Sequence, residues 1–236
     1  MAVILNIETS TEVCSVSLAR NGELLFEKGN NQEMNHSALL TVFVSEIFEK
    51  SNFSIKNIDA VAVSKGPGSY TGLRIGVSAA KGLCYALEKP LIAINTLDSM
   101  ADYTAENIRN FTNPDTDNIL LCPMIDARRM EVYTALYNLN GETVKLVDAV
   151  IIDEKSFSEY FENYKILFFG NGAEKCKNHI INPNAIFKGP LKTSARFMQS
   201  LSEDKYNKNE FEDVAYFEPF YFKDFTATIP KNKVLK

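Results

Sequence analysis

The segment 65–76, with the sequence KGPGSYTGLRIG, contains four of the chain's eleven glycines and carries the clearest potential for chemistry. Its first residues, 66–68, predict a tight turn with little side-chain bulk, after which Ser69 or Thr71 can cap a helix. Free N–H groups at the start of a helix favour a bound anion. The glycine spacing matches neither the Walker pattern nor the dinucleotide-binding fingerprint, so the loop predicts an anion site without naming its ligand.

Glu8 and Asp126 each follow an apolar run typical of a buried strand. Two such carboxylates facing across a cleft would suit a nucleotide with a bound metal ion, and Arg128 and Arg129 could add phosphate contacts. The alternatives are that Glu8 caps a turn and that one arginine pairs with Asp126 or Glu131. The residues predicted to face a nucleotide are these two acids and the glycines of two turns: Glu8, Gly66, Gly68, Asp126, Gly170 and Gly172.

Catalytic and metal-binding side chains are otherwise few. The two histidines, His36 and His179, lack the spacing of a zinc-binding helix, and no Gly-x-Ser-x-Gly sequence occurs. The four cysteines are far apart and include no Cys-x-x-Cys pair, so we expect buried thiols rather than a disulfide framework. We therefore predict no catalytic residue and no metal site.

The composition is that of a globular protein with a substantial core, with 45% hydrophobic residues. A net charge of −5 argues against nucleic-acid binding by the overall field of the protein and leaves a local basic patch possible. The sequence has no signal peptide and no apolar run of the ~20 residues that a membrane span needs, which predicts a soluble cytoplasmic protein.

The apolar pattern predicts two similar halves separated by the polar segment 110–118. Each half begins with a meander of about three strands and continues with alternating helices and strands, so we expect two mixed sheets covered by helices. Asn-Gly pairs at 21–22 and 140–141 predict tight hairpin turns. The expected strands are 2–7, 13–19, 23–28, 60–64, 90–94, 119–125, 131–138, 143–152 and 166–169, and the expected helices are 37–50, 71–87, 98–109 and 154–163.

Two of the expected helices have unusual surfaces. Apolar residues cover well over half of the circumference of helix 37–50, although a helix on a sheet needs one apolar stripe. Helix 71–87 carries small residues, Gly72, Gly76 and Ala80, at every fourth position. These small residues either pack closely on the protein's own sheet or contact another subunit, and the excess apolar surface of helix 37–50 favours a partner or a homodimer.

Four segments together resemble the TsaB family, also called YeaZ. They are ILNIETSTEVCSVSL at 4–18, GPGSYTGLRIG at 66–76, IDARRMEVY at 125–133 and EPFYFK at 218–223. The resemblance implies an α/β, actin-like (ASKHA, sugar kinase/Hsp70) fold of two ribonuclease-H-like mixed-sheet halves. The expected domains are an N-terminal domain (1–109, joined by 214–226), a C-terminal domain (110–213) and a tail (227–236).

The resemblance also implies a non-catalytic subunit that is required to make threonylcarbamoyladenosine at position 37 of tRNAs reading ANN codons. It implies a heterodimer with a TsaD-type transferase, recruitment of a TsaE-type ATPase, and indirect contact with tRNA through the complex. The sequence leaves open whether tRNA also touches this chain itself. ATP or ADP could bind at the subunit interface, and a homodimer could form when the partner is absent. The implied partner interface lies on the two helices and comprises His36, Leu40, Phe43, Val44, Ile47, Tyr70, Gly72, Arg74, Gly76 and Ala80.

An alternative is a stand-alone ATPase or small-molecule kinase of the same fold, which Glu8, Asp126 and the two glycine turns would serve. The chain departs from the family pattern in having Glu8 where many relatives have Asp, and Lys223 where Arg is common. If helices 37–50 and 71–87 form the partner surface, a charged residue in place of Phe43 or Gly76 should weaken the heterodimer while the fold survives.

Overall fold

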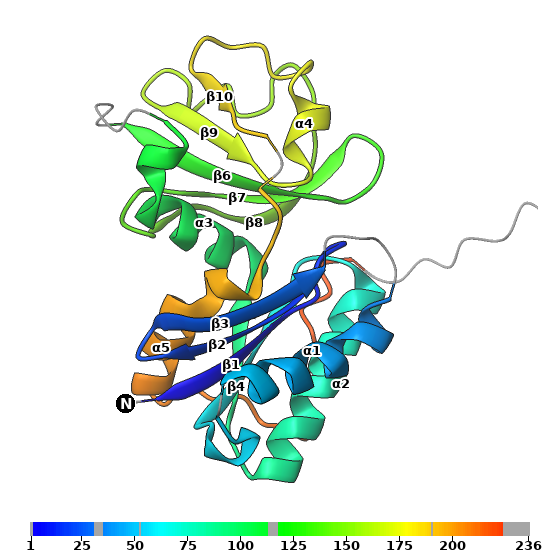
Figure 1. Ribbon diagram of the computed structural model, residues 1–236. Helices are drawn as coiled ribbons and strands as arrows, with labels where there is room; N and C mark the ends of the chain where they lie inside the picture. Colours follow the sequence, from blue (N-terminus) through cyan, green and yellow to red (C-terminus); the bar gives the residue numbers. More distant parts are fainter. Residues whose placement is uncertain (1, 31–34, 52, 113–117, 190, 224–236) are drawn as a thin grey trace, which may run out of the picture.

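The computed structural model describes residues 2–30, 35–51, 53–112, 118–189 and 191–223, and the predicted tail 227–236 lies outside them. Each half of the molecule is built on a mixed five-stranded sheet (Figure 1). The first sheet consists of β1 (Val3–Glu8), β2 (Cys14–Arg20), β3 (Glu23–Asn30), β4 (Ala60–Gly66) and β5 (Leu91–Asn95). The second consists of β6 (Ile119–Asp126), β7 (Glu131–Tyr137), β8 (Thr143–Ile151), β9 (Lys165–Phe169) and β10 (Ala185–Phe187).

The two sheets have the same topology. In the first, β1, β2 and β3 pair antiparallel in a meander, and β1, β4 and β5 pair in parallel. In the second, β6, β7 and β8 repeat the meander, and β6, β9 and β10 repeat the parallel strands. Asn21 and Gly22, both with positive φ, form the predicted turn between β2 and β3. The predicted actin-like fold of two ribonuclease-H-like halves is thereby confirmed.

Helices cover the two faces of the first sheet differently. One face carries α1 (His36–Ser51) and α2 (Tyr70–Leu87), and the other carries a 3₁₀ turn (Ala195–Met198) followed by α5 (Gln199–Asn207) (Figure 1). The sequence predicted that 110–213 belongs to the second half, but residues 195–207 of this segment pack on the first sheet. Met198 and Leu201 bury their side chains against Ile4 and Ile92 of the first sheet, because the inner face of that sheet would otherwise stay exposed.

Helix α3 (Thr96–Glu106) lies between the two sheets (Figure 1). Its Leu97 and Met100 join a core with Leu121 and Phe169 of the second sheet. The predicted helix 98–109 thus starts two residues earlier, where Asn95 Oδ1 accepts a hydrogen bond from the N–H of Leu97 at 3.0 Å, and its end is a separate 3₁₀ turn (Ile108–Asn110).

The outer face of the second sheet is covered by turns and by the short α4 (Ala173–Cys176). The predicted helix 154–163 is wrong, since this segment is a series of turns. Phe157 has a φ of 66°, which a regular helix does not allow, and this conformation places its ring against Phe168 at a centroid distance of 5.3 Å. No helix among the described residues is long and apolar enough to cross a membrane.

Candidate functional site

A cleft of about 970 Å³ lies between the two halves. β1 runs parallel to β4, and β6 runs parallel to β9, so the loops that follow these four strands gather at two sheet edges. These loops contribute Thr11, Gly68, Arg128 and Asn171 to the lining of the cleft, and the C-terminal segment adds Lys223. Ligands in open α/β sheets commonly bind at such carboxyl ends, which makes the cleft the first candidate site.

Glu8 does not line this cleft, contrary to the prediction. Its side chain is fully buried, and its Oε1 accepts hydrogen bonds from the N–H of Ser10 at 2.6 Å and the hydroxyl of Ser64 at 3.0 Å. Burial raises the pKa of Glu8, against the opposing effect of these hydrogen bonds. The turn-capping alternative therefore describes Glu8, and the predicted pair of acids across a cleft is not assembled.

The glycines predicted to face a nucleotide mostly serve close packing. A Cβ on Gly66 would lie 2.8 Å from the carbonyl oxygen of Phe220, and one on Gly170 would lie 2.3 Å from that of Met124. Both residues have positive φ, and Gly172 is buried against Asp126. From the predicted nucleotide-facing set, the structure thus brings Gly68 and Asp126 to the cleft and leaves the others inside the halves.

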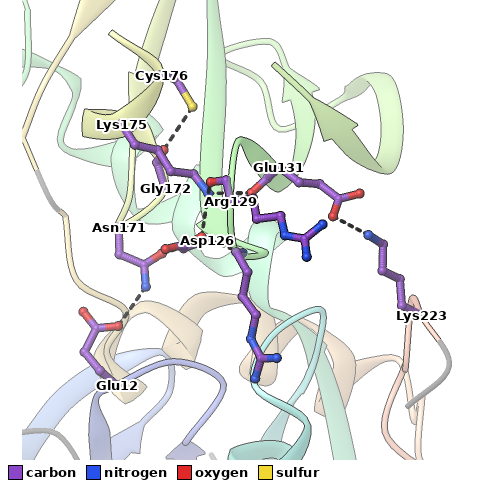
Figure 2. Close-up of polar contacts among 10 residues, drawn as sticks. Glu12, Asp126, Arg129, Glu131, Asn171, Gly172, Lys175, Cys176 and Lys223 are labelled. Carbon is purple, nitrogen blue, oxygen red and sulfur yellow. Dashed lines mark hydrogen bonds and ion pairs between the residues drawn. The ribbon is translucent and has the colours of Figure 1, made fainter. Parts of the chain in front are cut away.

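Asp126 is held by a lysine that sequence reasoning did not single out. The ammonium group of Lys175 donates to Asp126 Oδ1 at 2.6 Å and to the carbonyl oxygens of Arg129 and Glu131, both at 2.7 Å (Figure 2). The Glu131 carboxylate forms an ion pair with Lys223 (Figure 2). The turn between β6 and β7 is therefore fixed from both sides by lysines.

Asn171 connects the two halves at the cleft. Its Oδ1 accepts from the N–H of Asp126 at 3.0 Å, and its Nδ2 donates to Glu12 Oε2 at 2.8 Å (Figure 2). The sequence placed Asn171 in a Gly-Asn-Gly turn, but its partner Glu12 is 159 residues away. Both carboxylates on the cleft lining are thus engaged within the protein, and the residues present do not fit a site for a metal-bound triphosphate.

A second hollow, a groove of about 470 Å³, runs between α1 and α2. Thr41 of α1 and Tyr70, Arg74 and Ser78 of α2 line it. The guanidinium of Arg74 lies 5.5 Å from the ring centroid of Tyr70 and donates to its hydroxyl at 3.3 Å. Tyr70 also lines the cleft between the two halves, so the groove and this cleft are continuous.

Seven of the ten predicted interface residues face the protein's own interior, which corrects that prediction. On α2, Ala80 is buried, and Cβ atoms on Gly72 and Gly76 would lie 2.1 and 2.2 Å from oxygen atoms of Thr9. The small residues therefore let α2 pack on the loop after β1, so the alternative of close packing within the chain holds. The aliphatic and aromatic members on α1 belong to the core of the first half: Leu40, Phe43, Val44 and Ile47.

The three remaining predicted interface residues, His36, Tyr70 and Arg74, are partly or well exposed. His36 Nε2 lies 2.9 Å from the carbonyl oxygen of Thr11, at the base of the cleft. Together with the exposed Val42 and Tyr85, they leave α1 and α2 with an outer surface that the described part of the chain does not cover.

Nucleophilic and metal-binding groups are not gathered at either hollow within the described ranges. All four cysteines are free and buried, and burial raises the pKa of Cys14 to about 11 and that of Cys122 to about 12. These thiols stay protonated at neutral pH and are poor nucleophiles. Among the residues that the structure describes, no group of three or more His, Cys, Asp or Glu side chains could hold a metal ion.

Comparison with known proteins places the chain in a family. The family described as "TsaD: tRNA N6-adenosine threonylcarbamoyltransferase" matches residues 23–231. The tRNA threonylcarbamoyladenosine biosynthesis protein TsaB of Bacillus subtilis (strain 168) is 31% identical over 229 residues, which is 93% of each chain. A tRNA N6-adenosine threonylcarbamoyltransferase of Fervidobacterium nodosum is 33% identical over 108 residues, 39% of this chain and 32% of that protein.

A solved structure of YeaZ from Pseudomonas aeruginosa has the same fold, with a TM-score of 0.77 and 24% identity over 94% of this chain and 100% of that one. The match to the Bacillus protein extends over nearly the whole of both chains, whereas the match to the Fervidobacterium transferase covers about a third of that enzyme. Since that full-length match exceeds 30% identity and the YeaZ fold agrees with the two sheets described above, the chain belongs to the TsaB (YeaZ) family.

Proposed function

We propose that this chain is the non-catalytic subunit required for threonylcarbamoyl transfer to adenosine 37 of tRNAs that read ANN codons. In this proposal it binds and activates a TsaD-type transferase and helps to recruit a TsaE-type ATPase, in the cytoplasm. The observation that carries the proposal is similarity over 93% of both chains to a relative named for the biosynthesis of this modification. Similarity over 39% of this chain to the transferase itself supports a paralogous pair of subunits.

The outer faces of α1 and α2 are the surface that we assign to the transferase. They carry exposed apolar side chains, Val42 with 47% and Tyr85 with 85% of its surface accessible, beside the groove lined by Tyr70 and Arg74. An apolar surface with a groove and a single guanidinium is suited to a protein partner. In the absence of the transferase, the same surface is expected to pair two copies of this chain.

The non-catalytic part of the proposal is supported by the chemistry of the two hollows. Glu8 is buried, Asp126 is paired with Lys175, and the described thiols are protonated. ATP or ADP, if it binds, is assigned to the subunit interface, where Gly68 and Tyr70 connect the cleft with the groove. A stand-alone ATPase or kinase would need the pair of strand-end acids that this chain keeps apart.

The direct test mixes the purified chain with its TsaD-type transferase and measures the mass of the complex by size exclusion with light scattering. Phe43 and Gly76 are unsuitable targets because both are buried, and a charge there would unfold the first half. The informative variant is Arg74→Glu, on the exposed rim of the groove, and the matched control is Lys188→Glu, an exposed residue of the second half.

We expect a heterodimer with the wild type and with Lys188→Glu, and a weakened one with Arg74→Glu. Equal binding by all three would reject this surface. If the chain forms no complex with the transferase and hydrolyses ATP by itself, the proposal is rejected in favour of a stand-alone enzyme.

A further inference from the structure

The turn between β6 and β7 holds two arginines in a backbone conformation that their side chains disfavour. Arg128 has a φ of 73° and Arg129 a φ of 49°, both in the left-handed region where the Cβ atom crowds the backbone. The tight turn between β2 and β3 has Asn21 and Gly22 at equivalent values, 53° and 77°. The protein therefore keeps arginines at two positions where Asn-Gly would be easier to accommodate, and side-chain chemistry is the property that such a replacement would lose.

Among the described residues, neither arginine has an acidic partner, because lysines pair with the nearby carboxylates. Asp126 is paired with Lys175, and Glu131 is paired with Lys223 (Figure 2). No ion pair joins either guanidinium to another residue in the part of the chain that the structure describes. Arg128 and Arg129 therefore present two positive charges that the protein does not itself neutralise.

The turn exposes both charges, and hydrogen bonds hold its backbone in place. Both arginines are exposed, and Arg128 lines the cleft. Lys175 donates to the carbonyl oxygen of Arg129, and the N–H of Arg128 donates to Asp126 Oδ1 at 2.7 Å, so the backbone of the turn is braced. Guanidiniums carried on a turn whose backbone is held in this way are suited to bidentate contacts with phosphate oxygens.

Aromatic side chains line the same cleft as Arg128. Tyr133 and Phe222 line the same cleft, with ring centroids 5.9 Å apart in an edge-on arrangement. Burial raises the pKa of Tyr133; the charge of Glu131 adds to this, and the charges of Lys223 and Arg128 oppose it. Proteins that bind single-stranded nucleic acids commonly combine positive charges for the phosphates with aromatic rings on which the bases stack.

We propose that Arg128 and Arg129 bind successive phosphates of an RNA backbone, so that this chain contacts RNA directly. The proposal rests on the proposed function, which supplies RNA as the substrate class. A free nucleoside triphosphate offers the same phosphate chemistry, so the test includes an ATP arm that separates the two ligands. With a net charge of −5, the protein depends on this local pair rather than on its overall field.

The test measures binding of a fluorescein-labelled RNA hairpin, with the sequence of a tRNA anticodon arm, by fluorescence anisotropy over a range of salt concentrations. The variant combines Arg128→Asn with Arg129→Gly and so copies the Asn21-Gly22 turn. Its matched control combines Arg109→Gln with Lys188→Gln. Both residues are exposed, and the two substitutions remove the same amount of charge as the turn variant. Unlabelled ATP is added in a separate arm, and thermal unfolding of every protein is recorded.

We expect the turn variant to bind RNA about tenfold more weakly, with a salt dependence shallower by roughly one to two phosphate contacts. We expect the control to bind like the wild type and the turn variant to unfold at no lower temperature, because its turn residues suit positive φ. Equal RNA binding by turn variant and control would overturn the proposal. Tight ATP binding that needs the arginines, without RNA binding, would overturn it in favour of a nucleotide site.

The two proposals fail in different ways. If the transferase forms a complex with the chain but the turn variant binds RNA normally, the RNA site is wrong and the subunit role stands. If no complex forms while RNA binding still depends on Arg128 and Arg129, the subunit role is wrong and the RNA site stands.

Discussion

The two halves of the molecule share one strand order but differ in what covers it. The first sheet is enclosed by α1 and α2 on one face and α5 on the other, and α1 and α2 leave an outer surface exposed. The second sheet has turns and the four-residue α4 in the corresponding outer layer. Among the described residues, long helices therefore occupy this layer in the first half alone.

The two halves also differ in the acidic residue at the end of their first strand. Glu8 at the end of β1 is buried and caps its own turn, whereas Asp126 at the end of β6 is exposed and paired with Lys175. Topologically equivalent carboxylates therefore have different roles, one within the core of a half and one at the surface of the cleft. An internal repeat of architecture does not imply a repeat of chemistry.

The largest expected effect tests how α2 is seated on the first half. Gly72→Ala would place a Cβ 2.1 Å from the carbonyl oxygen of Thr9, so we expect the free energy of unfolding to fall by about 3 kcal/mol. Gly82→Ala on the same helix meets nothing within 4 Å and should stabilise by about 1 kcal/mol. Urea denaturation measures both, and equal effects at the two positions would contradict the close approach of α2 to the loop after β1.

A smaller effect should separate the two strand-end acids. Glu8→Ala leaves the buried N–H of Ser10 and hydroxyl of Ser64 without their acceptor, which should cost about 2 kcal/mol of the free energy of unfolding. Asp126→Ala removes an exposed ion pair and should cost less than about 1 kcal/mol. Denaturant unfolding of the two variants measures both losses. A larger loss in the free energy of unfolding for Asp126→Ala than for Glu8→Ala would contradict the different roles of the two acids.

The smallest effect concerns α3, which joins the halves. Burial raises the pKa of Asp102 to about 6, and the charges of Glu106 and Asp204 add to this. The folded protein therefore binds this proton more tightly than the unfolded chain does. The stability contributed by Asp102 is fully present below about pH 4 and is lost as the pH rises to 6.

Asp102→Asn should accordingly raise the free energy of unfolding at pH 7 by about 1 kcal/mol and leave it nearly unchanged at pH 4. Thermal unfolding at the two pH values measures the difference. If the variant is stabilised equally at both pH values, or is destabilised at both, then ionisation of Asp102 does not lower the free energy of unfolding.

Local patterns predicted the strands and most of the helices of this fold. The apolar run that ends at Glu8, the Asn21-Gly22 turn and the cap at Ser69, whose Oγ accepts from the N–H of Gly72 at 3.2 Å, all involve residues close in sequence. The helix predicted over 154–163 failed because the ring of Phe157 is drawn into the core against Phe168, and that contact outweighs local helix propensity.

The candidate site was less predictable because its contacts join distant residues. Arg128 and Asp126 were identified from the sequence, but nothing in their neighbourhood indicated that Lys175 would take the carboxylate. The same holds for Lys223, which reaches Glu131 from the C-terminal segment, and for the bond between Asn171 and Glu12. The one available signal was that Glu12, Asn171 and Lys223 lie in loops or turns, whereas Lys175 lies in the short helix α4.

The sequence by itself determined the duplicated order of strands, the positions of the tight turns and the family, because these depend on periodicity, turn residues and short motifs. Only the tertiary structure decided which side of each helix is inward. A periodic pattern specifies that Leu40, Phe43 and Gly76 are covered, but not whether the cover is the protein's own sheet or a partner. It likewise decided that Lys175, and not Arg128, pairs with Asp126, since competition for a carboxylate is settled by distances between residues far apart in the chain.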